Sequence, residues 1–266
     1  MHPLCLDFLT AVEASPVELA ELAAANGLDL IAIMTHPADG VPDFGMDRDT
    51  PMRREVRRRC RDLGISIDMT EGFLLKPETD VADFRRALDA SGWLEARCVN
   101  VLLRDPDLCR LKDNFTAFCD IACEYGLDVV TEWSRRTPLP SPAQAAAFLA
   151  AMNRTNAKLQ FDSLHLYRAG FTAADIAKLS PSIVGRAQLS DGPAEMPIDR
   201  QFDEALSNRL VPGDGELPLA EFLKTLPGGT VVGIEVPMGS LQAQGIGPEE
   251  RVHRAVVGAR SLSAPA

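Results

Sequence analysis

Four polar residues in the second half of the chain each stand at the end of an apolar run typical of a buried strand. Glu132 lies in VVTEWS, Asp162 in LQFDSLH, Gln188 in RAQLSDG and Glu235 in VGIEVP. A buried carboxylate costs several kcal/mol unless it is paired or binds a cation. Three carboxylates and an amide therefore predict a site for one hard divalent ion, Mn²⁺ or Mg²⁺, with Co²⁺ or Zn²⁺ as alternatives.

Each of these residues also has a simpler interpretation. Asp162 could cap the helix that follows it, and Glu132 could form an ion pair with Arg135 or Arg136. His165, one of four histidines, stands three residues after Asp162 and could be an ordinary loop or core histidine. The occurrence of such residues at four successive strand ends is what favours the metal site.

The strands that would position these residues recur along the whole chain. Short apolar runs rich in β-branched residues occupy 4–9, 28–34, 65–69, 98–103, 127–133, 158–162, 183–190 and 230–236. Segments with helix-start chemistry lie between them. Ser15, Pro16 and Glu18 form a capping-box pattern, and segments 50–64 and 141–153 begin with the same Ser/Thr-Pro device.

Near-continuous apolar strands alternating with amphipathic helices are typical of a parallel sheet covered by helices. Eight such units predict an α/β fold, a single (β/α)8 TIM barrel over residues 1–266. A doubly wound sheet would normally carry a glycine-rich turn after its first strand, and the turn here, LTAVEASPVE, has no glycine.

The composition narrows the classes of partner. A net charge of −11 argues against nucleic acid and anionic membranes, and no apolar run reaches the roughly 18 residues of a membrane span. None of the six cysteines forms a CxxC pair, so we expect buried, reduced thiols in a cytoplasmic protein.

These residues resemble the xylose isomerase-like barrels of the sugar phosphate isomerase/epimerase family. The resemblance covers nearly the whole chain and is specific from TEWSRRTPLPSPAQA onwards. The family binds one divalent ion through a Glu, an Asp, a His or Gln, and a second Glu, which match Glu132, Asp162, Gln188 and Glu235. Its Asp-x-x-His motif ends at His165.

Two further features refine the resemblance. The loop RLVPGDGELPL, starting at Arg209, matches the family's Arg-x-x-Pro-Gly-x-Gly motif. Gln188 is similar to the hydroxypyruvate isomerase branch, which carries glutamine where ketose 3-epimerases carry histidine. The chain departs from that branch at Arg186, where a histidine is common.

The resemblance implies a metal-dependent isomerase or epimerase that acts on a small hydroxy-carbonyl substrate through an enediolate. Glu132 and Glu235 would be the acid/base pair, and His165 would hydrogen-bond a substrate hydroxyl. Return of the proton by one glutamate gives isomerisation, and delivery by the other to the opposite face gives epimerisation. A homodimer or homotetramer is usual for similar barrels.

We expect Arg209, with the backbone of the 213–215 loop, to hold a distal oxygen or carboxylate of the substrate. A plain turn is the alternative for this loop. His36, Glu71 and Trp133 are further candidates for the pocket lining, although Trp133 fits core packing equally well.

Three other functions use related platforms. A dehydratase of the same superfamily would eliminate water β to a carbonyl, with His165 or a glutamate protonating the leaving hydroxyl. An apurinic endonuclease would need many histidines and a basic surface, which four histidines and the acidic net charge disfavour. A non-catalytic sugar- or metal-binding barrel would not need both Glu132 and Glu235.

Overall fold

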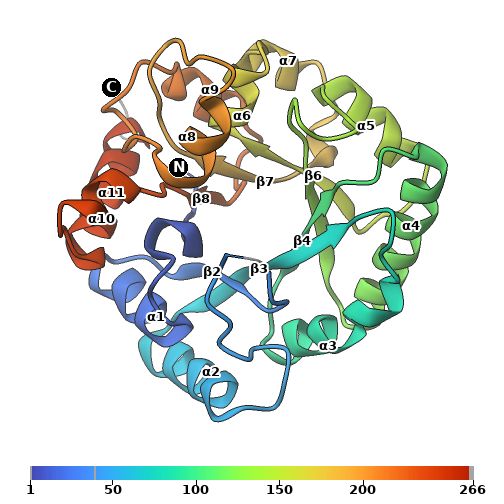
Figure 1. The fold of residues 1–266 in the computed structure, drawn as a ribbon, viewed down its shortest axis with the longest axis horizontal. Helices are drawn as coiled ribbons and strands as arrows, with labels where there is room; N and C mark the ends of the chain where they lie inside the picture. Colours follow the sequence, from blue (N-terminus) through green and yellow to red (C-terminus); the bar gives the residue numbers. More distant parts are fainter. Residues whose placement is uncertain (1, 39, 264–266) are drawn as a thin grey trace.

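Eight parallel strands pair in chain order, and the last pairs with the first, in a computed structural model that describes residues 2–38 and 40–263 (Figure 1). The (β/α)8 barrel prediction is therefore confirmed. The strands are β1 (Leu4–Asp7), β2 (Leu30–Met34), β3 (Ser66–Leu75), β4 (Cys98–Leu103), β5 (Asp128–Glu132), β6 (Ala157–Asp162), β7 (Val184–Leu189) and β8 (Val232–Ile234).

Helices surround the barrel and link successive strands (Figure 1). They are α1 (Pro16–Ala25), α2 (Pro51–Leu63), α3 (Arg85–Trp93), α4 (Leu108–Glu124), α5 (Pro142–Ala150), α6 (Ser163–Arg168), α7 (Ala173–Ala177), α8 (Gln201–Ser207), α9 (Leu219–Thr225), α10 (Gly239–Ala243) and α11 (Pro248–Ser263). Three short 3₁₀ turns are η1 (Phe8–Ala11), η2 (Val81–Phe84) and η3 (Pro181–Ile183). In the described ranges, no helix has both the length and the apolar character needed to cross a membrane.

The predicted helix starts are confirmed by their cap geometry. Ser15 accepts a hydrogen bond from the backbone N–H of Glu18, and the Glu18 carboxylate accepts one from Ser15, which completes the capping box of α1. Thr50 and Ser141 cap α2 and α5 in the same way, each followed by proline. These caps satisfy N–H groups that have no partner within the helix.

Strand β3 is longer than the predicted run 65–69, because a bulge lets it continue through the polar segment that ends in Gly72. Gly72 has φ +111°, and a Cβ there would clash with the backbone carbonyl of His36. Glu71, predicted to follow the strand, thus lies within it. Its side chain lines the cavity described below.

One part of the barrel interior is apolar. Small and medium side chains from successive strands form a cluster separate from the main core, namely Cys5, Ala32, Met69, Cys98 and Val130. Burial raises the pKa of the Cys98 thiol to about 12, so this thiol stays protonated. All six cysteines are free thiols, as expected, but only four are buried, because Cys109 and Cys123 are exposed on α4.

Candidate active site

A cavity of about 150 Å³ lies where the strands end at their carboxyl termini. Its walls include side chains from β3, β4 and β5 and from the segments that follow β6 and β8, among them Glu71, Asn100, Glu132, His165 and Glu235. Parallel strands converge at this end of a TIM barrel, which is why residues far apart in the chain share one cavity.

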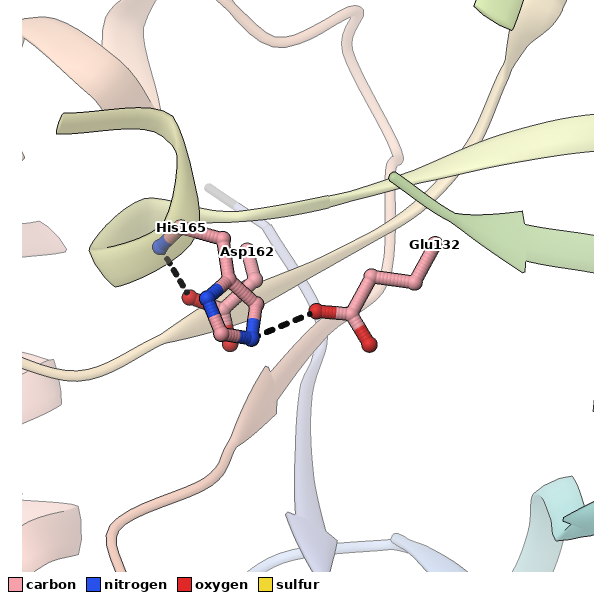
Figure 2. A group of neighbouring side chains, drawn as sticks. All are labelled: Glu132, Asp162 and His165. Carbon is pink, nitrogen blue, oxygen red and sulfur yellow. Dashed lines mark hydrogen bonds and ion pairs between the residues drawn. The ribbon is translucent and has the colours of Figure 1, made fainter. Parts of the chain in front are cut away.

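Glu132, Asp162 and His165 form one side of the site (Figure 2). Asp162 Oδ1 accepts the backbone N–H of His165 at 3.0 Å, so Asp162 also caps α6, as one interpretation predicted. His165 Nε2 lies 3.0 Å from Glu132 Oε1. Burial lowers the pKa of His165, but the nearby charges of Glu132 and Asp162 outweigh burial and raise it above its usual value. The imidazole therefore tends to be protonated beside the two carboxylates.

Arg209 bridges Asp162 and Glu235. Its Nη1 donates to Asp162 Oδ2 at 2.6 Å, and its Nη2 lies 2.9 Å from Glu235 Oε2. The guanidinium is buried, and its Nε donates to the Ala205 carbonyl at 2.7 Å. Arg209 lines the cavity as predicted, but its donors are committed to protein acceptors, so its first effect is to position two carboxylates.

Gln188 faces Glu235 with its amide nitrogen. Nε2 donates to Glu235 Oε1 at 2.6 Å and to Asp7 Oδ2 at 3.0 Å. Its Oε1 accepts from Gln160 Nε2 at 2.8 Å, and Gln160 Oε1 accepts from Arg186 at 3.2 Å. Because a guanidinium can only donate, Arg186 fixes both amides in this direction. The ligand role of Gln188 stays a prediction, and it requires this amide to turn over.

Below the cavity, Arg186 lies at the centre of a fully buried ion-pair cluster. Its guanidinium binds both oxygens of Asp7, and its Nε donates to Asp68 Oδ2 at 2.8 Å. Arg97 donates to the other oxygen of Asp68 at 2.6 Å. Gly233 leaves room for this cluster, since a Cβ there would clash with Asp7 and Arg186.

The cavity, by contrast, holds acceptors that lack donors. Across the described residues, Glu71 Oε1 and Asn100 Oδ1 are buried and accept no hydrogen bond. Glu132 Oε1 has its ion-pair contact with His165 but no well-directed hydrogen bond. Burial, and then the charge of Asp7, raise the pKa of Glu71 to about 8. Buried acceptors without partners mark places where a ligand or cation can supply the missing contact.

The donor set fits a divalent cation. Among the residues that the structure describes, two groups of three side chains have candidate ligand atoms within 4.8 Å of one another, namely Glu132, Asp162 and His165, and Asp7, Glu71 and Glu235. The predicted ligands Glu132 and Asp162 fall in the first group and Glu235 in the second, with the Arg209 bridge between Asp162 and Glu235. Burial, and then the charges of Glu71, Asp162 and Asp7, raise the pKa of Glu235 well above its usual value despite Arg209. A bound cation would compensate the negative charge of these crowded carboxylates.

Two predicted substrate-binding residues lie elsewhere. The His36 ring stacks on Phe73 at 5.5 Å and meets Phe84 edge-on at 4.9 Å, in a separate surface hollow beside β3. Trp133 is buried and packs edge-on against Phe161 and Phe171, so core packing is the correct interpretation. In both cases the strand-end position was correct, but the side chain turns toward aromatic neighbours.

The glycine loop also differs from the prediction. The backbone N–H groups of Gly213, Gly215 and Leu217 donate to the carboxylate of Asp191 at 2.9, 3.1 and 3.1 Å. Asp191 is buried and also accepts from Gly192. The loop is therefore a turn anchored on Asp191, and its N–H groups are used within the protein.

Sequence reasoning missed Asn100 and Arg104 in the cavity lining. Asn100 interrupts the apolar run CVNVLL, and that interruption was the signal that could have found it. Arg104, Arg135 and Arg136 also line the cavity. Glu132 pairs with His165 and not with Arg135 or Arg136, the alternative that the sequence left open.

One known family and several solved structures share this barrel fold. The pattern of one family, described as xylose isomerase-like TIM barrel, matches residues 20–257. A search of curated proteins finds no match. Among solved structures, the "IOLI protein with a binding zinc atom" has 21% identity and a TM-score of 0.81, over 98% of this chain and 97% of that chain.

Two other structures show the same fold at low identity. A D-psicose 3-epimerase, solved in the presence of D-fructose, is 16% identical with a TM-score of 0.75, over 97% of both chains. A "xylose isomerase-like TIM barrel/4-hydroxyphenylpyruvate dioxygenase fusion protein" is 19% identical with a TM-score of 0.80, over 98% of this chain and 42% of that chain.

Proposed function

Because this chain belongs to the xylose isomerase-like TIM barrel family, we propose that it is a divalent-metal-dependent isomerase or epimerase of a small hydroxy-carbonyl compound. One observation carries the proposal. Carboxylates from β5, β6 and the end of β8 line or border one cavity that also holds acceptors without donors. A structural ion-pair cluster would have no reason to leave such acceptors unpaired.

Glu132, Asp162 and Glu235 would hold the cation, and Gln188 would join them only if its amide turned over. A bound divalent ion would polarise a substrate carbonyl and lower the pKa of the adjacent C–H bond. Mn²⁺ and Mg²⁺ suit a carboxylate-rich set, and His165 in the first group also suits Zn²⁺ or Co²⁺.

The two glutamates differ in their freedom to move a proton. Both oxygens of Glu235 are held, one by Gln188 and the other by Arg209. In the described part of the chain, Glu132 has only the His165 contact at its Oε1. Glu132 is therefore the carboxylate freer to exchange a proton with a substrate, whereas Glu235 is held in place by its two partners. A single mobile base favours isomerisation, in which Glu132 removes a proton and returns it to the neighbouring carbon.

His165 would orient the substrate. Its imidazole lines the cavity and keeps 23% of its side chain exposed. The charges of Glu132 and Asp162 outweigh burial and raise the pKa of His165, which favours the protonated ring, so Nε2–H can donate to Glu132 or to a substrate oxygen.

The same protonated His165 supports a second candidate, a dehydratase. An imidazolium at the cavity wall can protonate a leaving hydroxyl after Glu132 has removed a proton from the neighbouring carbon. The two reactions use the same first step and differ in whether water leaves.

A screen of hydroxy-ketones and hydroxy-keto acids in D₂O tests both candidates. Deuterium in a product of unchanged composition supports isomerisation, and loss of water supports the dehydratase. Glu132→Gln should lower the rate by about 10²–10⁴-fold, whereas the exposed control Glu78→Gln should not change it. Exchange without any contribution from Glu132 would contradict the proposal.

A further inference from the structure

Three arginines at the cavity mouth have no acidic partner. Arg104 follows β4, and Arg135 and Arg136 follow β5; all three are exposed and line the cavity. Within residues 2–38 and 40–263, no carboxylate lies within ion-pair distance of any of them. In a protein of net charge −11, three unpaired guanidiniums around one cavity are an unusual concentration of positive charge.

Other arginines in the same cavity are already paired. Arg168 donates to both oxygens of Glu204 at 2.7 and 2.6 Å, and Arg209 contacts Asp162 and Glu235. These two guanidiniums are buried, and their charge is compensated within the protein. By contrast, the positive charge of Arg104, Arg135 and Arg136 is not compensated by a carboxylate of the described chain, so it can attract an anionic ligand.

The mouth arginines are positioned without using an acid. Arg104 Nη1 lies 3.5 Å from the Arg136 carbonyl, and Arg135 Nη1 donates to the Arg168 carbonyl at 3.3 Å. The Arg136 guanidinium lies over the Phe202 ring, 3.9 Å from its centroid. Stacking and carbonyl contacts orient a guanidinium while leaving its remaining N–H groups available.

In the described chain, the floor of the cavity carries polar oxygen atoms without hydrogen-bond partners, not positive charge. Asn100 Nδ2 donates to Glu71 Oε2 at 3.3 Å, which leaves Asn100 Oδ1 and Glu71 Oε1 as acceptors. A hydroxyl group can donate to such an oxygen, and it can also accept from Glu71 when that carboxyl is protonated. Positive charge at the mouth and acceptors at the floor thus select for a molecule with an anionic end and a hydroxylated end.

We infer that the substrate is a polyhydroxylated anion, whose carboxylate or phosphate binds Arg104, Arg135 and Arg136 while its hydroxyls donate to Glu71 and Asn100. The inference rests on the proposed function for the reaction and adds the substrate class. The apolar side chains of Leu9, Leu102 and Leu164 in the same lining exclude water and strengthen the attraction.

Three probes with one carbon skeleton separate the contributions. D-Glucitol is neutral, D-gluconate carries a carboxylate, and D-glucitol 6-phosphate carries a phosphate. Binding of each to the purified protein is measured by isothermal titration calorimetry at low salt. The variants are Arg104→Gln/Arg136→Gln and a control, Arg61→Gln, which changes an exposed arginine near the amino end of β3.

We expect at least one anion to bind about tenfold or more tightly than D-glucitol. The double variant should lose about tenfold or more of that affinity and leave D-glucitol binding unchanged, whereas Arg61→Gln should change neither. The anion that binds more tightly identifies the source, carboxylate or phosphate. Equal affinity for all three probes, anion binding that survives the double variant, or no response to either anion at millimolar concentration would overturn the inference.

Total metal, measured on the same samples, keeps this test separate from the proposed function. Arginine-dependent anion binding by a protein that holds no metal would sustain this inference and contradict the proposed function. Bound metal without anion preference would do the reverse.

Discussion

Two polar clusters lie in the same barrel and differ in one respect. In the lower cluster, Arg186, Asp7, Asp68 and Gln160 are all buried, and each has hydrogen-bond partners for its polar atoms. In the upper cluster, at the cavity, Glu71, Asn100 and Glu132 keep acceptors without hydrogen bonds in the described chain. Burial alone does not mark a site. We call a cluster saturated when all its polar atoms have hydrogen-bond partners, and such a cluster supports the fold. An unsaturated cluster keeps polar atoms without partners and can bind a ligand or a cation.

The two clusters meet at one pair of amides. Gln160 belongs to the lower cluster and donates to Gln188, which donates to Glu235 in the upper one. Arg186 is thus linked to Gln188, at the proposed active site, through two hydrogen bonds: Arg186 to Gln160 and Gln160 to Gln188. A substitution can therefore be aimed at either cluster or at the junction.

The largest effect is expected from Arg186→Met, which removes the centre of the lower cluster. Asp7 and Asp68 would lose their buried counterion, at a cost of about 3–5 kcal/mol in the free energy of unfolding. Urea denaturation measures this cost. Arg97→Met is the matched control, because Arg97 binds the same Asp68 but keeps 39% of its side chain exposed.

For Arg97→Met the expected loss is about 1 kcal/mol or less. Equal losses in the free energy of unfolding for the two variants would show that the buried Arg186 contributes no more to stability than the partly exposed Arg97. That result would contradict the structural role given to the lower cluster.

A smaller effect is expected at the junction, from Gln160→Leu. This change removes the donor to Gln188 Oε1 and one acceptor of Arg186, and should cost about 1–3 kcal/mol. It also frees the Gln188 amide to turn its oxygen toward Glu235. We expect tighter binding of Mn²⁺ per folded molecule, measured by calorimetry; weaker binding would indicate that the present amide orientation is the one that serves the metal.

An effect of opposite sign is expected for Glu71→Gln in metal-free protein. The folded pKa of Glu71, about 8, lies above its ordinary value of 4.5, so the folded state holds a proton that the unfolded state releases. The parent therefore loses stability as pH rises from 4.5 to 8.

The amide does not titrate, so Glu71→Gln should be more stable than the parent at pH 8 by about 4 kcal/mol, with the gain vanishing near pH 4. Thermal unfolding of both proteins across this range checks the slope. A gain of the same size at both ends of the range would mean that Glu71 is not protonated in the folded state.

The sequence was informative where local pattern decides structure. Apolar runs and the Ser15 capping box predicted the barrel, because strands and helix starts follow from neighbouring residues. Glu132, Asp162 and Glu235 were identified since strand ends in a parallel barrel meet at one face.

Features that depend on long-range contacts could not be predicted. The direction of the Gln188 amide is set by Arg186 through Gln160, and Asp68 lies 118 residues from Arg186. The fate of His36 depends on the aromatic rings of Phe73 and Phe84. The sequence likewise does not show which arginines form ion pairs, because their partners come from loops that meet only in the folded protein.

The central claim, that the unsaturated cluster binds a divalent ion, is tested most directly by total metal content from inductively coupled plasma mass spectrometry. The parent is compared with Glu132→Gln/Glu235→Gln and with the exposed control Glu78→Gln/Glu221→Gln. We predict about one divalent ion per chain in the parent and the control, and loss of that ion in the active-site variant. A parent protein that holds no metal, and that added Mn²⁺ neither binds nor stabilises, would contradict the account.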